Sequence, residues 1–371
     1  MLGLIDWLAC AHAGREQRAA VAARGTASDL YGRVAAAATA GHVLDFDDTY
    51  LPGLAHLSAP VAPAACVLGA EIDATVGDVF DAYTLGFEAM GAVARSSHPQ
   101  LYDRGWHPTA VCGCVGAAVA AGHLLELDPP RAETAVSLAL LAAGGLLSAF
   151  GTDGKSLQVG FAAAHGVRAA RLAGEGARST VRVLDGFADA YGGSWAEPDA
   201  ARPAVDDNWI KAYPCCLQTH GAIEVVEAAR QVGERGPLEI TVHPVSRQAA
   251  PYDDVSDGLE AKFSIPYTIA YTLLYGPPEL GAFEGVDPAV AELARQIGVA
   301  TSTDLLESEA RLVAASGFEA RVEAAMGSPQ KPMTPEKLNE KVRSLSGEVL
   351  DDVFEDPGQP AKIFVEAARL S

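Results

Sequence analysis

Residues 238–243 read Leu-Glu-Ile-Thr-Val-His, and they mark the point at which the chain changes its pattern of apolar residues. Apolar and polar side chains alternate here, which is the period of a β-strand with one buried face. Two more strands are predicted at 311–315 and 319–324, around a turn at Ser316-Gly317. The helices predicted among these strands cover residues 265–274, 288–297 and 335–344. The sequence therefore predicts a small α+β unit in this part of the chain.

Before this point the pattern is helical almost throughout, from Ile5 to about Leu172. The clearest predicted helices cover residues 58–71, 76–95, 109–126, 131–150 and 159–173. Their many Ala and Gly residues predict closely packed helices, because small side chains let two backbones approach each other. Residues 178–207, which are rich in Gly, Asp and Pro, are interpreted as an irregular connection, and residues 360–370 are predicted to be helical again.

These patterns predict a mostly α fold with a smaller α+β part. We place a large all-helical domain at residues 1–207 and expect residues 345–371 to complete it. The α+β domain is placed at residues 208–344.

The charge of the chain excludes some classes of partner. A formal net charge of −21 over 371 residues would repel the phosphates of nucleic acids and of anionic lipid surfaces. An acidic substrate would need a locally basic site, so each of the seven lysines is informative. The lysines to which we assign no role are Lys331, Lys337, Lys341 and Lys362.

We interpret no segment of the sequence as a targeting signal or as a membrane span. The N-terminal residues MLGLIDWLACAHAGREQ lack the basic start of a signal peptide, and Asp6 interrupts their apolar run. The longest apolar run, 135–150, is too short for a membrane span and is interpreted as a buried helix. The six cysteines form no metal-binding pattern and are interpreted as small buried thiols. We expect a soluble, cytoplasmic protein that binds neither membranes nor nucleic acid.

Residues 42–50, His-Val-Leu-Asp-Phe-Asp-Asp-Thr-Tyr, place three carboxylates beside an apolar run, with His56 close behind. If the stretch is helical, His42, Asp45 and Thr49 share one face. A carboxylate held against apolar neighbours has a raised pKa and can exchange protons near neutral pH. An exposed acidic helix end is an equally good interpretation. The letters DFDD also fit the DxDD motif of class II terpene cyclases, although a chain with 7% aromatic residues does not suit a carbocation cavity.

Three other stretches place acid–base or cationic groups at loops or helix ends. Residues 149–156, AFGTDGKS, nearly match a P-loop but follow a predicted helix rather than a strand, so what remains is a Gly-rich loop that presents Lys155. His107, in Gly-Trp-His-Pro-Thr, precedes a predicted helix that begins at Pro108. Lys211 and Tyr267 lie near the predicted junction of the two halves, where ligand sites are common. Together with Asp45 and His56, these groups suit the binding of a polycarboxylate and proton transfer beside a carboxylate.

The motifs HVLDFDDT (42–49), GWHPTA (105–110), GTDGKSLQVGFAAAHGVRAARLA (151–173), KAYPCCLQTH (211–220) and EAKFSIPYTIA (260–270) together resemble the MmgE/PrpD family. That family includes 2-methylcitrate dehydratase, cis-aconitate decarboxylase and iminodisuccinate epimerase. The resemblance implies a large helical domain with an α+β lid, an active site in the cleft between them, a homodimer, and no metal or other cofactor. By motif, the active-site residues of the decarboxylase branch fall on Asp45, Thr49, His56, His107, Lys155, Lys211 and Tyr267.

The resemblance therefore implies a cofactor-independent lyase or isomerase acting on a small di- or tricarboxylate, by dehydration or decarboxylation. Its substrate-binding residues would be His56, Lys155 and Lys211. Its catalytic residues would be His107 as general acid or base, Asp45 and Thr49 as orienting groups, and Tyr267 as a donor from the lid. An epimerase, a non-catalytic carboxylate-binding protein and, more remotely, a DxDD cyclase remain as alternatives.

Overall fold

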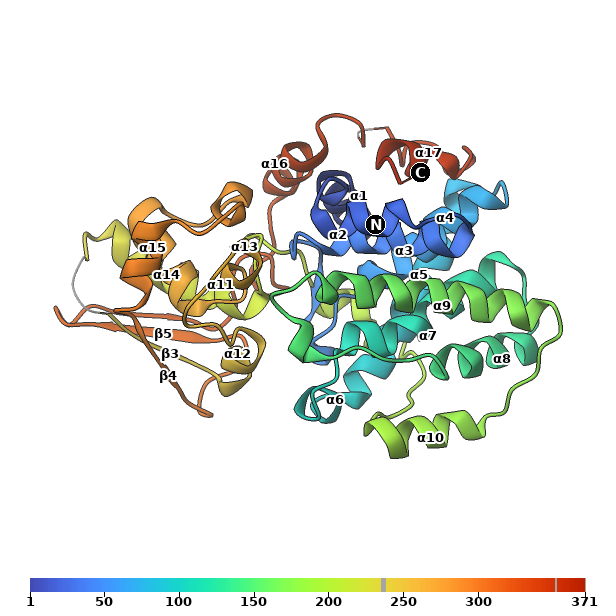
Figure 1. Cartoon of the computed structure of the whole chain (residues 1–371), viewed down its shortest axis with the longest axis horizontal. Helices are drawn as coiled ribbons and strands as arrows, with labels where there is room; N and C mark the ends of the chain where they lie inside the picture. Colours follow the sequence, from blue (N-terminus) through green and yellow to red (C-terminus); the bar gives the residue numbers. More distant parts are fainter. Residues whose placement is uncertain (235–237, 351, 371) are drawn as a thin grey trace.

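A computed structural model describes residues 1–234, 238–350 and 352–370, and it shows a large helical part beside a smaller part built around a sheet (Figure 1). The α-helices of the larger part are α1 (Leu2–Gly14), α2 (Arg18–Gly25), α3 (Leu30–His42), α4 (Ser58–Glu71), α5 (Val76–Ser97), α6 (Gln100–Asp103), α7 (Pro108–Leu124), α8 (Pro129–Leu140), α9 (Gly154–Gly174), α10 (Arg182–Tyr191), α16 (Pro335–Ser346) and α17 (Lys362–Ala367). Those of the smaller part are α11 (Leu217–Gln231), α12 (Pro244–Ala249), α13 (Gly258–Ala261), α14 (Ile265–Tyr275) and α15 (Pro288–Ala294). The predicted mostly α fold with an α+β part is confirmed.

Helices α7 and α9 form the centre of the helical part, and small residues set their spacing. A Cβ atom added to Gly166 of α9 would lie 2.5 Å from the Cβ atom of Ala117 and 2.7 Å from the carbonyl oxygen of Cys114, both on α7. No side chain larger than hydrogen fits there without moving one of the backbones. The close packing predicted from Ala and Gly content is confirmed at this contact, and the six cysteines are buried and free, as expected.

The smaller part contains a mixed sheet in the order β4-β3-β5-β6. Its strands are β3 (Leu238–Val242), β4 (Gly298–Thr301), β5 (Ala310–Ala314) and β6 (Glu319–Val322). Strand β3 pairs with β4 in parallel and with β5 in an antiparallel register that sets Ile240 opposite Leu312. Both of these side chains are fully buried, while their neighbours Glu239 and Arg311 are exposed. The alternation read from the sequence therefore gives one buried face, which packs against α11.

A second, two-stranded sheet joins the two parts of the molecule. Strand β1 (Thr49–Tyr50) pairs antiparallel with β2 (Asn208–Trp209), so that Thr49 lies opposite Trp209. The largest hydrophobic cluster draws on residues 4–204 and 342–370, and two smaller clusters draw mainly on residues 215–314. This distribution agrees with the predicted boundary at 207, whereas position 344 lies within α16, whose Val342 and Leu345 both belong to the helical cluster. Both boundaries stay a prediction, and two residues of the range 345–371, Asp351 and Ser371, lie outside the described residues.

Two helix predictions were wrong. The helix predicted to end at Phe150 ends at Leu140, because the chain turns at Gly144-Gly145, where Gly145 has a φ of 124° that other residues rarely adopt. The connection predicted as irregular at 178–207 contains helix α10. Its Phe187 and Tyr191 stack on each other with ring centroids 5.5 Å apart and help to cover the helical core. Within the described ranges, no helix has both the length and the apolar character that crossing a membrane requires.

Candidate active site

Six of the seven residues singled out from the sequence line one cavity where the two parts of the molecule meet. The cavity has a volume of about 40 Å³ and is hereafter called the central cavity. The predicted residues around it are Asp45, Thr49, His56, His107, Lys155 and Lys211. Its other lining residues are Leu54, Tyr102, Phe150, Cys216, Leu217, Gln218, Ala249 and Phe263. Charged groups and aromatic rings therefore share a small, nearly closed space.

The acidic stretch after α3 is a turn, so the helical arrangement that the sequence left open for it is not adopted. Helix α3 ends at His42, Asp45 has a left-handed φ of 52°, and strand β1 begins at Thr49. Asp is one of the few residues other than Gly that adopt this conformation readily. The turn aims the Asp45 carboxylate at lysines from two distant segments, whereas a helix would have carried it along the α3 axis.

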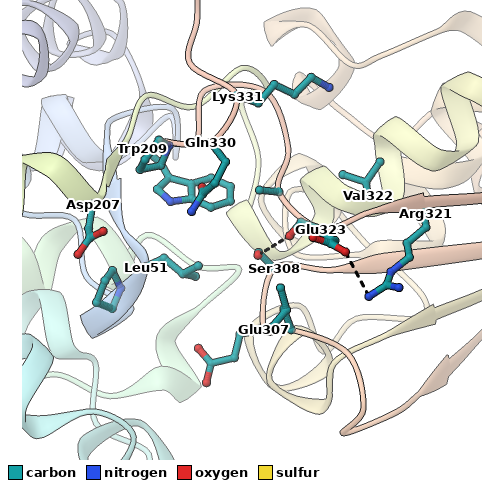
Figure 2. Close-up of a pocket in the computed structure, with 14 residues that line it drawn as sticks. Leu51, Asp207, Trp209, Glu307, Ser308, Arg321, Val322, Glu323, Gln330 and Lys331 are labelled. Carbon is teal, nitrogen blue, oxygen red and sulfur yellow. Dashed lines mark hydrogen bonds and ion pairs between the residues drawn. The ribbon is translucent and has the colours of Figure 1, made fainter.

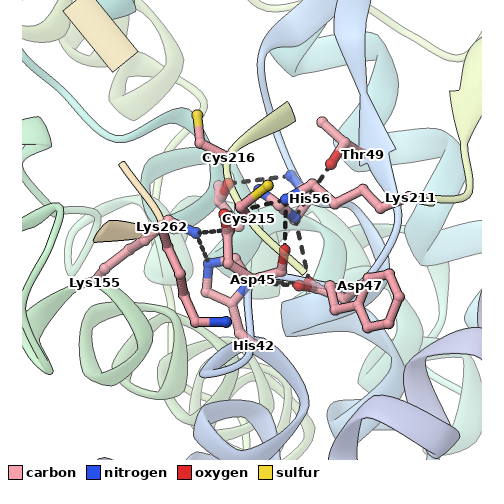
Figure 3. A network of polar contacts seen from close by, with 12 residues as sticks. His42, Asp45, Asp47, Thr49, His56, Lys155, Lys211, Cys215, Cys216 and Lys262 are labelled. Atoms are coloured by element: carbon pink, nitrogen blue, oxygen red, sulfur yellow. Dashed lines mark hydrogen bonds and ion pairs between the residues drawn. The ribbon is translucent and has the colours of Figure 1, made fainter. Parts of the chain in front are cut away.

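Asp45 forms the charged centre of the network shown in Figure 3. Its Oδ1 accepts a hydrogen bond from Lys155 Nζ at 2.6 Å, and its Oδ2 lies 3.2 Å from Lys211 Nζ. Burial alone would raise the pKa of Asp45, but the two ammonium groups hold it well below its usual value. Burial likewise works to lower the pKa of Lys211, and Asp45 and Asp47 together raise it. Asp45 is therefore an anion, opposite to the raised pKa that its apolar neighbours suggested.

Three buried lysines donate hydrogen bonds to three consecutive carbonyl oxygens of this turn. Lys262 donates to Leu44 at 2.7 Å, Lys211 to Asp45 at 2.8 Å, and Lys341 to Phe46 at 2.8 Å. These carbonyls follow the C-terminal end of α3, where the helix dipole favours cations. Lys341, to which sequence reasoning assigned no role, also forms a buried ion pair with Asp6 at 2.5 Å. No local pattern marks it, because its partners lie near the other end of the chain.

His42 and Asp47 were also missed as parts of the site. His42 Nε2 lies 2.8 Å from Lys155 Nζ, and its Nδ1 lies 2.9 Å from a carboxylate oxygen of Asp47. Because an ammonium group can only donate, Nε2 accepts and the ring proton sits on Nδ1, facing Asp47. Neutral His42 thus links Asp47 to Lys155 and holds the Lys155 ammonium group in place. The signal available in the sequence was its position as the last residue of a helix, directly before the acidic turn.

The two predicted imidazoles face different surroundings. Gln158 is anchored by Leu146, whose N–H donates to its Oε1 at 2.8 Å, so its Nε2 donates to His107 Nδ1 at 2.7 Å. Neutral His107 therefore carries its proton on Nε2. His56 Nδ1 lies 3.4 Å from Asp47 Oδ2. Its Nε2 lies 3.8 Å from an oxygen of Asp45.

Burial lowers the pKa of both imidazoles, to about 3 for His56 and well below the usual value for His107. Nearby Asp47 opposes this effect on His56, whereas Lys155 reinforces it on both rings. Both rings are therefore neutral at pH 7 in the ligand-free protein. Only His56 has a carboxylate near each nitrogen, so it is the ring that can be stabilised as a cation.

The structure does not bring Tyr267 into the central cavity. Its side chain is fully buried in the cluster that includes Cys215 and Ile223, and its hydroxyl oxygen accepts the N–H of Asp287 at 3.0 Å. Tyr267 does lie in the first turn of α14, where the Ser264 side chain caps the helix by accepting the N–H of Tyr267. Its proposed role as a proton donor has no geometric support in this arrangement.

A larger groove, of about 780 Å³, opens beside the two-stranded sheet (Figure 2). It contains none of the predicted site residues, and its charged groups already have partners, mostly outside the groove: Glu307 contacts His98 at 3.1 Å, Arg321 contacts Glu309 at 2.6 Å and Lys331 contacts Glu224 at 2.6 Å. Arg321 lies 3.4 Å from Glu323, and Ser308 donates to the Glu323 carbonyl at 2.8 Å. Size alone therefore does not identify the site, and the convergence of cations and imidazoles favours the central cavity.

One group within the described residues has the composition of a metal site. The ligand atoms of His42, Asp47 and His56 lie within 4.8 Å of one another. Hydrogen bonding already accounts for the closest contact, in which His42 Nδ1–H faces Asp47. The arrangement of these three residues can therefore be explained by hydrogen bonding without an ion. Removal of metal distinguishes a hydrogen-bonded cluster from a metal site.

Comparison with known proteins finds a matching family model for each of the two parts of the chain. Residues 2–197 match the model of the MmgE/PrpD N-terminal domain, and residues 213–358 match that of the MmgE/PrpD C-terminal domain. The chain is 27% identical over 348 residues to a cis-aconitate decarboxylase of Mus musculus, covering 83% of this chain and 70% of the relative. It is 29% identical over 373 residues to one of Aspergillus terreus, covering 86% of this chain and 76% of the relative. The family inferred from the motifs is confirmed, and this chain belongs to the MmgE/PrpD family.

Proposed function

We propose that this protein is a lyase that removes carbon dioxide, or alternatively water, from a small polycarboxylate without a bound cofactor. The observation that carries the proposal is the central cavity, in which Lys155 and Lys211 face two neutral imidazoles in a buried space. The names of the relatives favour decarboxylation, and they favour a substrate similar to cis-aconitate.

The lysines supply the charge that such a substrate needs. In the ligand-free protein, Lys155 and Lys211 share the single carboxylate of Asp45, so these three groups together keep one positive charge for a substrate. A substrate with two carboxylates can share these cations, because each ammonium has three donors. Their field, acting in a space sealed from water, stabilises the negative charge that moves onto the carbon skeleton during the reaction.

We assign the proton transfer to His56 and the stabilisation of charge to His107, which exchanges the roles implied by the family resemblance. His107 presents an Nε2–H that can only donate a hydrogen bond, as long as Gln158 occupies its Nδ1. His56 can take a proton on Nε2 while Asp45 and Asp47 stabilise the resulting cation. Bound carboxylates raise its pKa further toward neutrality.

In decarboxylation, the bond between carbon and one carboxylate breaks and carbon dioxide leaves. The electron pair stays on the carbon skeleton and spreads into a remaining carboxylate, where Lys155, Lys211 and His107 stabilise it. Protonated His56 then transfers its proton to carbon. In dehydration, neutral His56 instead removes a proton beside a carboxylate, and hydroxide leaves from the neighbouring carbon. An epimerase would use the same proton transfers with no leaving group.

The terpene-cyclase alternative conflicts with the charge of its motif. A DxDD cyclase needs its middle aspartate, here Asp47, as a proton donor. Burial works to raise the pKa of Asp47, but His42 and His56 hold it well below its usual value, so it carries no proton to donate.

Proton NMR of the purified protein in D₂O tests the function directly. The panel contains cis-aconitate, citrate, 2-methylcitrate, iminodisuccinate and succinate, without added metal. We expect consumption of an aconitate-like or citrate-like member, with deuterium incorporated beside a carboxylate in the product. If no member of the panel is consumed or exchanges a proton, the lyase proposal fails and a binding role replaces it.

Removal of metal is expected to leave the activity unchanged. Because hydrogen bonds between His42 and Asp47 already hold that cluster together, no ion is needed to keep Lys155 in place. The measurement is the initial rate before and after dialysis against EDTA, with elemental analysis of both samples. A loss of rate that Zn²⁺ or Fe²⁺ restores would show that the trio is a metal site.

The pH dependence separates decarboxylation from dehydration. Burial lowers the pKa of His56 to about 3, so the free protein holds mostly neutral His56 between pH 6.5 and 8.5. Decarboxylation needs the protonated form, whose fraction grows about tenfold for each pH unit that the solution is acidified. We therefore expect kcat/KM to rise as pH falls through this range. Dehydration needs the neutral form, and a flat profile would support it instead.

A further inference from the structure

The first turn of α11 contributes a carboxamide to the central cavity that sequence reasoning did not single out. Gln218, the second residue of this 15-residue helix, is 7% exposed and lines the cavity next to Cys216 and Leu217. Its Oε1 accepts a hydrogen bond from the hydroxyl of Ser246 at 2.9 Å, and Ser246 is 1% exposed. The carboxamide is therefore held in one orientation by a second buried group.

The other end of this carboxamide is unpaired. In the described part of the chain, no group accepts a hydrogen bond from Gln218 Nε2, and the atom is shielded from solvent. A buried donor without an acceptor destabilises the folded protein, so a native structure that keeps one has a reason for it. The N-terminal end of α11 also favours a negative group at this position, because helix N-termini carry partial positive charge. Two independent features thus point to an anionic oxygen from a ligand.

We propose that Gln218 Nε2 binds a third oxygen group of the substrate, namely a carboxylate that pairs with neither Lys155 nor Lys211. This inference rests on the proposed function, and it adds Gln218 to the residues that would bind a substrate similar to cis-aconitate. Two lysines provide for two carboxylates. A neutral carboxamide accommodates the third without adding another cation, which would lower the pKa of His56 and oppose the protonation that decarboxylation needs.

Equilibrium binding of two unreactive probes tests the proposal. Propane-1,2,3-tricarboxylate and glutarate share the same chain of carbons between two carboxylates, and only the first carries a third carboxylate, on the central carbon. Calorimetry measures the Kd of each probe for the wild-type protein and for Gln218→Met, which keeps the length of the side chain and removes its donor. Gln248→Met, in neighbouring α12, is the matched control, since Gln248 is exposed and lies outside the cavity lining.

We expect Gln218→Met to raise the Kd of the tricarboxylate about tenfold or more, as the loss of a hydrogen bond to a charged group does. The Kd of glutarate should stay within about twofold, and Gln248→Met should change neither. Met removes the unpaired donor and also the Oε1 that accepts the Ser246 hydroxyl, so the Tm of Gln218→Met serves only to show that the variant is folded. A purely structural Gln218 would instead change the Kd of both probes equally. Ser246→Ala, which frees the carboxamide to rotate, should weaken tricarboxylate binding by a smaller factor.

Other outcomes overturn the inference. Gln218 does not bind a third carboxylate if its substitution affects both probes equally or affects neither. The same conclusion follows if the wild-type protein binds the tricarboxylate no more tightly than glutarate. Because these probes are not turned over, the result is independent of catalysis. A protein that discriminates between them through Gln218 but consumes no member of the carboxylate panel would contradict the proposed function and leave this inference standing.

Discussion

Replacing Lys155 by methionine is expected to lower kcat/KM by at least about 10³-fold. The variant loses an ammonium group that donates hydrogen bonds to Asp45 Oδ1 at 2.6 Å and to His42 Nε2 at 2.8 Å. Removal of a single donor to the developing charge in an active site costs about 10²–10³-fold in rate, and the loss of a charged partner for a substrate carboxylate adds to this. Steady-state kinetics on the substrate found by NMR measures the effect.

The same change removes one partner of a buried ion pair, which costs about 3–5 kcal/mol of folding free energy in other proteins. Loss of activity must therefore be separated from loss of structure. In Lys155→Met, Asp45 keeps its contact with Lys211 at 3.2 Å, so we expect the variant to fold with a lowered Tm while its activity stays low. Lys362→Met, which changes an exposed lysine, is the control. A folded Lys155→Met variant that keeps more than a tenth of wild-type kcat/KM would contradict the proposed role.

The second large effect is expected for His56→Gln, with a loss of kcat of about 10²–10⁴-fold because one positioned acid–base group is removed. His107→Gln should also lower kcat, by about 10²–10³-fold, through the loss of a hydrogen bond to the developing charge. The two variants differ in a second measurement. His56→Gln should abolish the rise of kcat/KM with falling pH, whereas His107→Gln should preserve it at a lower level.

His123→Gln is the control, since this histidine is exposed near the C-terminal end of α7. The reverse result, in which His107→Gln flattens the pH profile and His56→Gln retains it, would return the acid–base role to His107, as the family resemblance implies. The Tm of each variant establishes whether it is folded.

Sequence motifs were enough to name residues that meet in space, although the motifs are far apart in the chain. Asp45 and Lys155 lie 110 residues apart and form a 2.6 Å hydrogen bond. Each had a local signal, because each stands in a loop or at a helix end among residues of unusual chemistry. The alternation at 238–242 likewise identified the central strand of the sheet, since its two faces differ in burial.

Other features had no local signal. Gln218 and Lys341 belong to ordinary helical sequence, and only the packing of distant segments places them beside the acidic turn and the cavity. The residue spacing of the turn also fits one helical face, so the sequence left open a helix where Asp45 adopts a left-handed backbone. Helix α10 was missed because the Gly, Asp and Pro residues of 178–207 suggested an irregular connection, although Val183, Leu184, Phe187 and Tyr191 recur at helical spacing and pack on the core.

The lysines that hold the turn at 44–46 have a consequence for how the protein is made. The turn leaves the ribosome long before its three lysines, the last of which follows its carbonyl partner by 295 residues. At roughly 5–20 residues per second, that interval is about 15–60 s. During this time the carbonyl oxygens of the turn lack at least one of their three lysine donors, although Lys155 is already available to pair with Asp45. The acid–base centre therefore matures only near the end of translation, so a truncated product that ends before Lys211 would carry most of the catalytic side chains and remain inert.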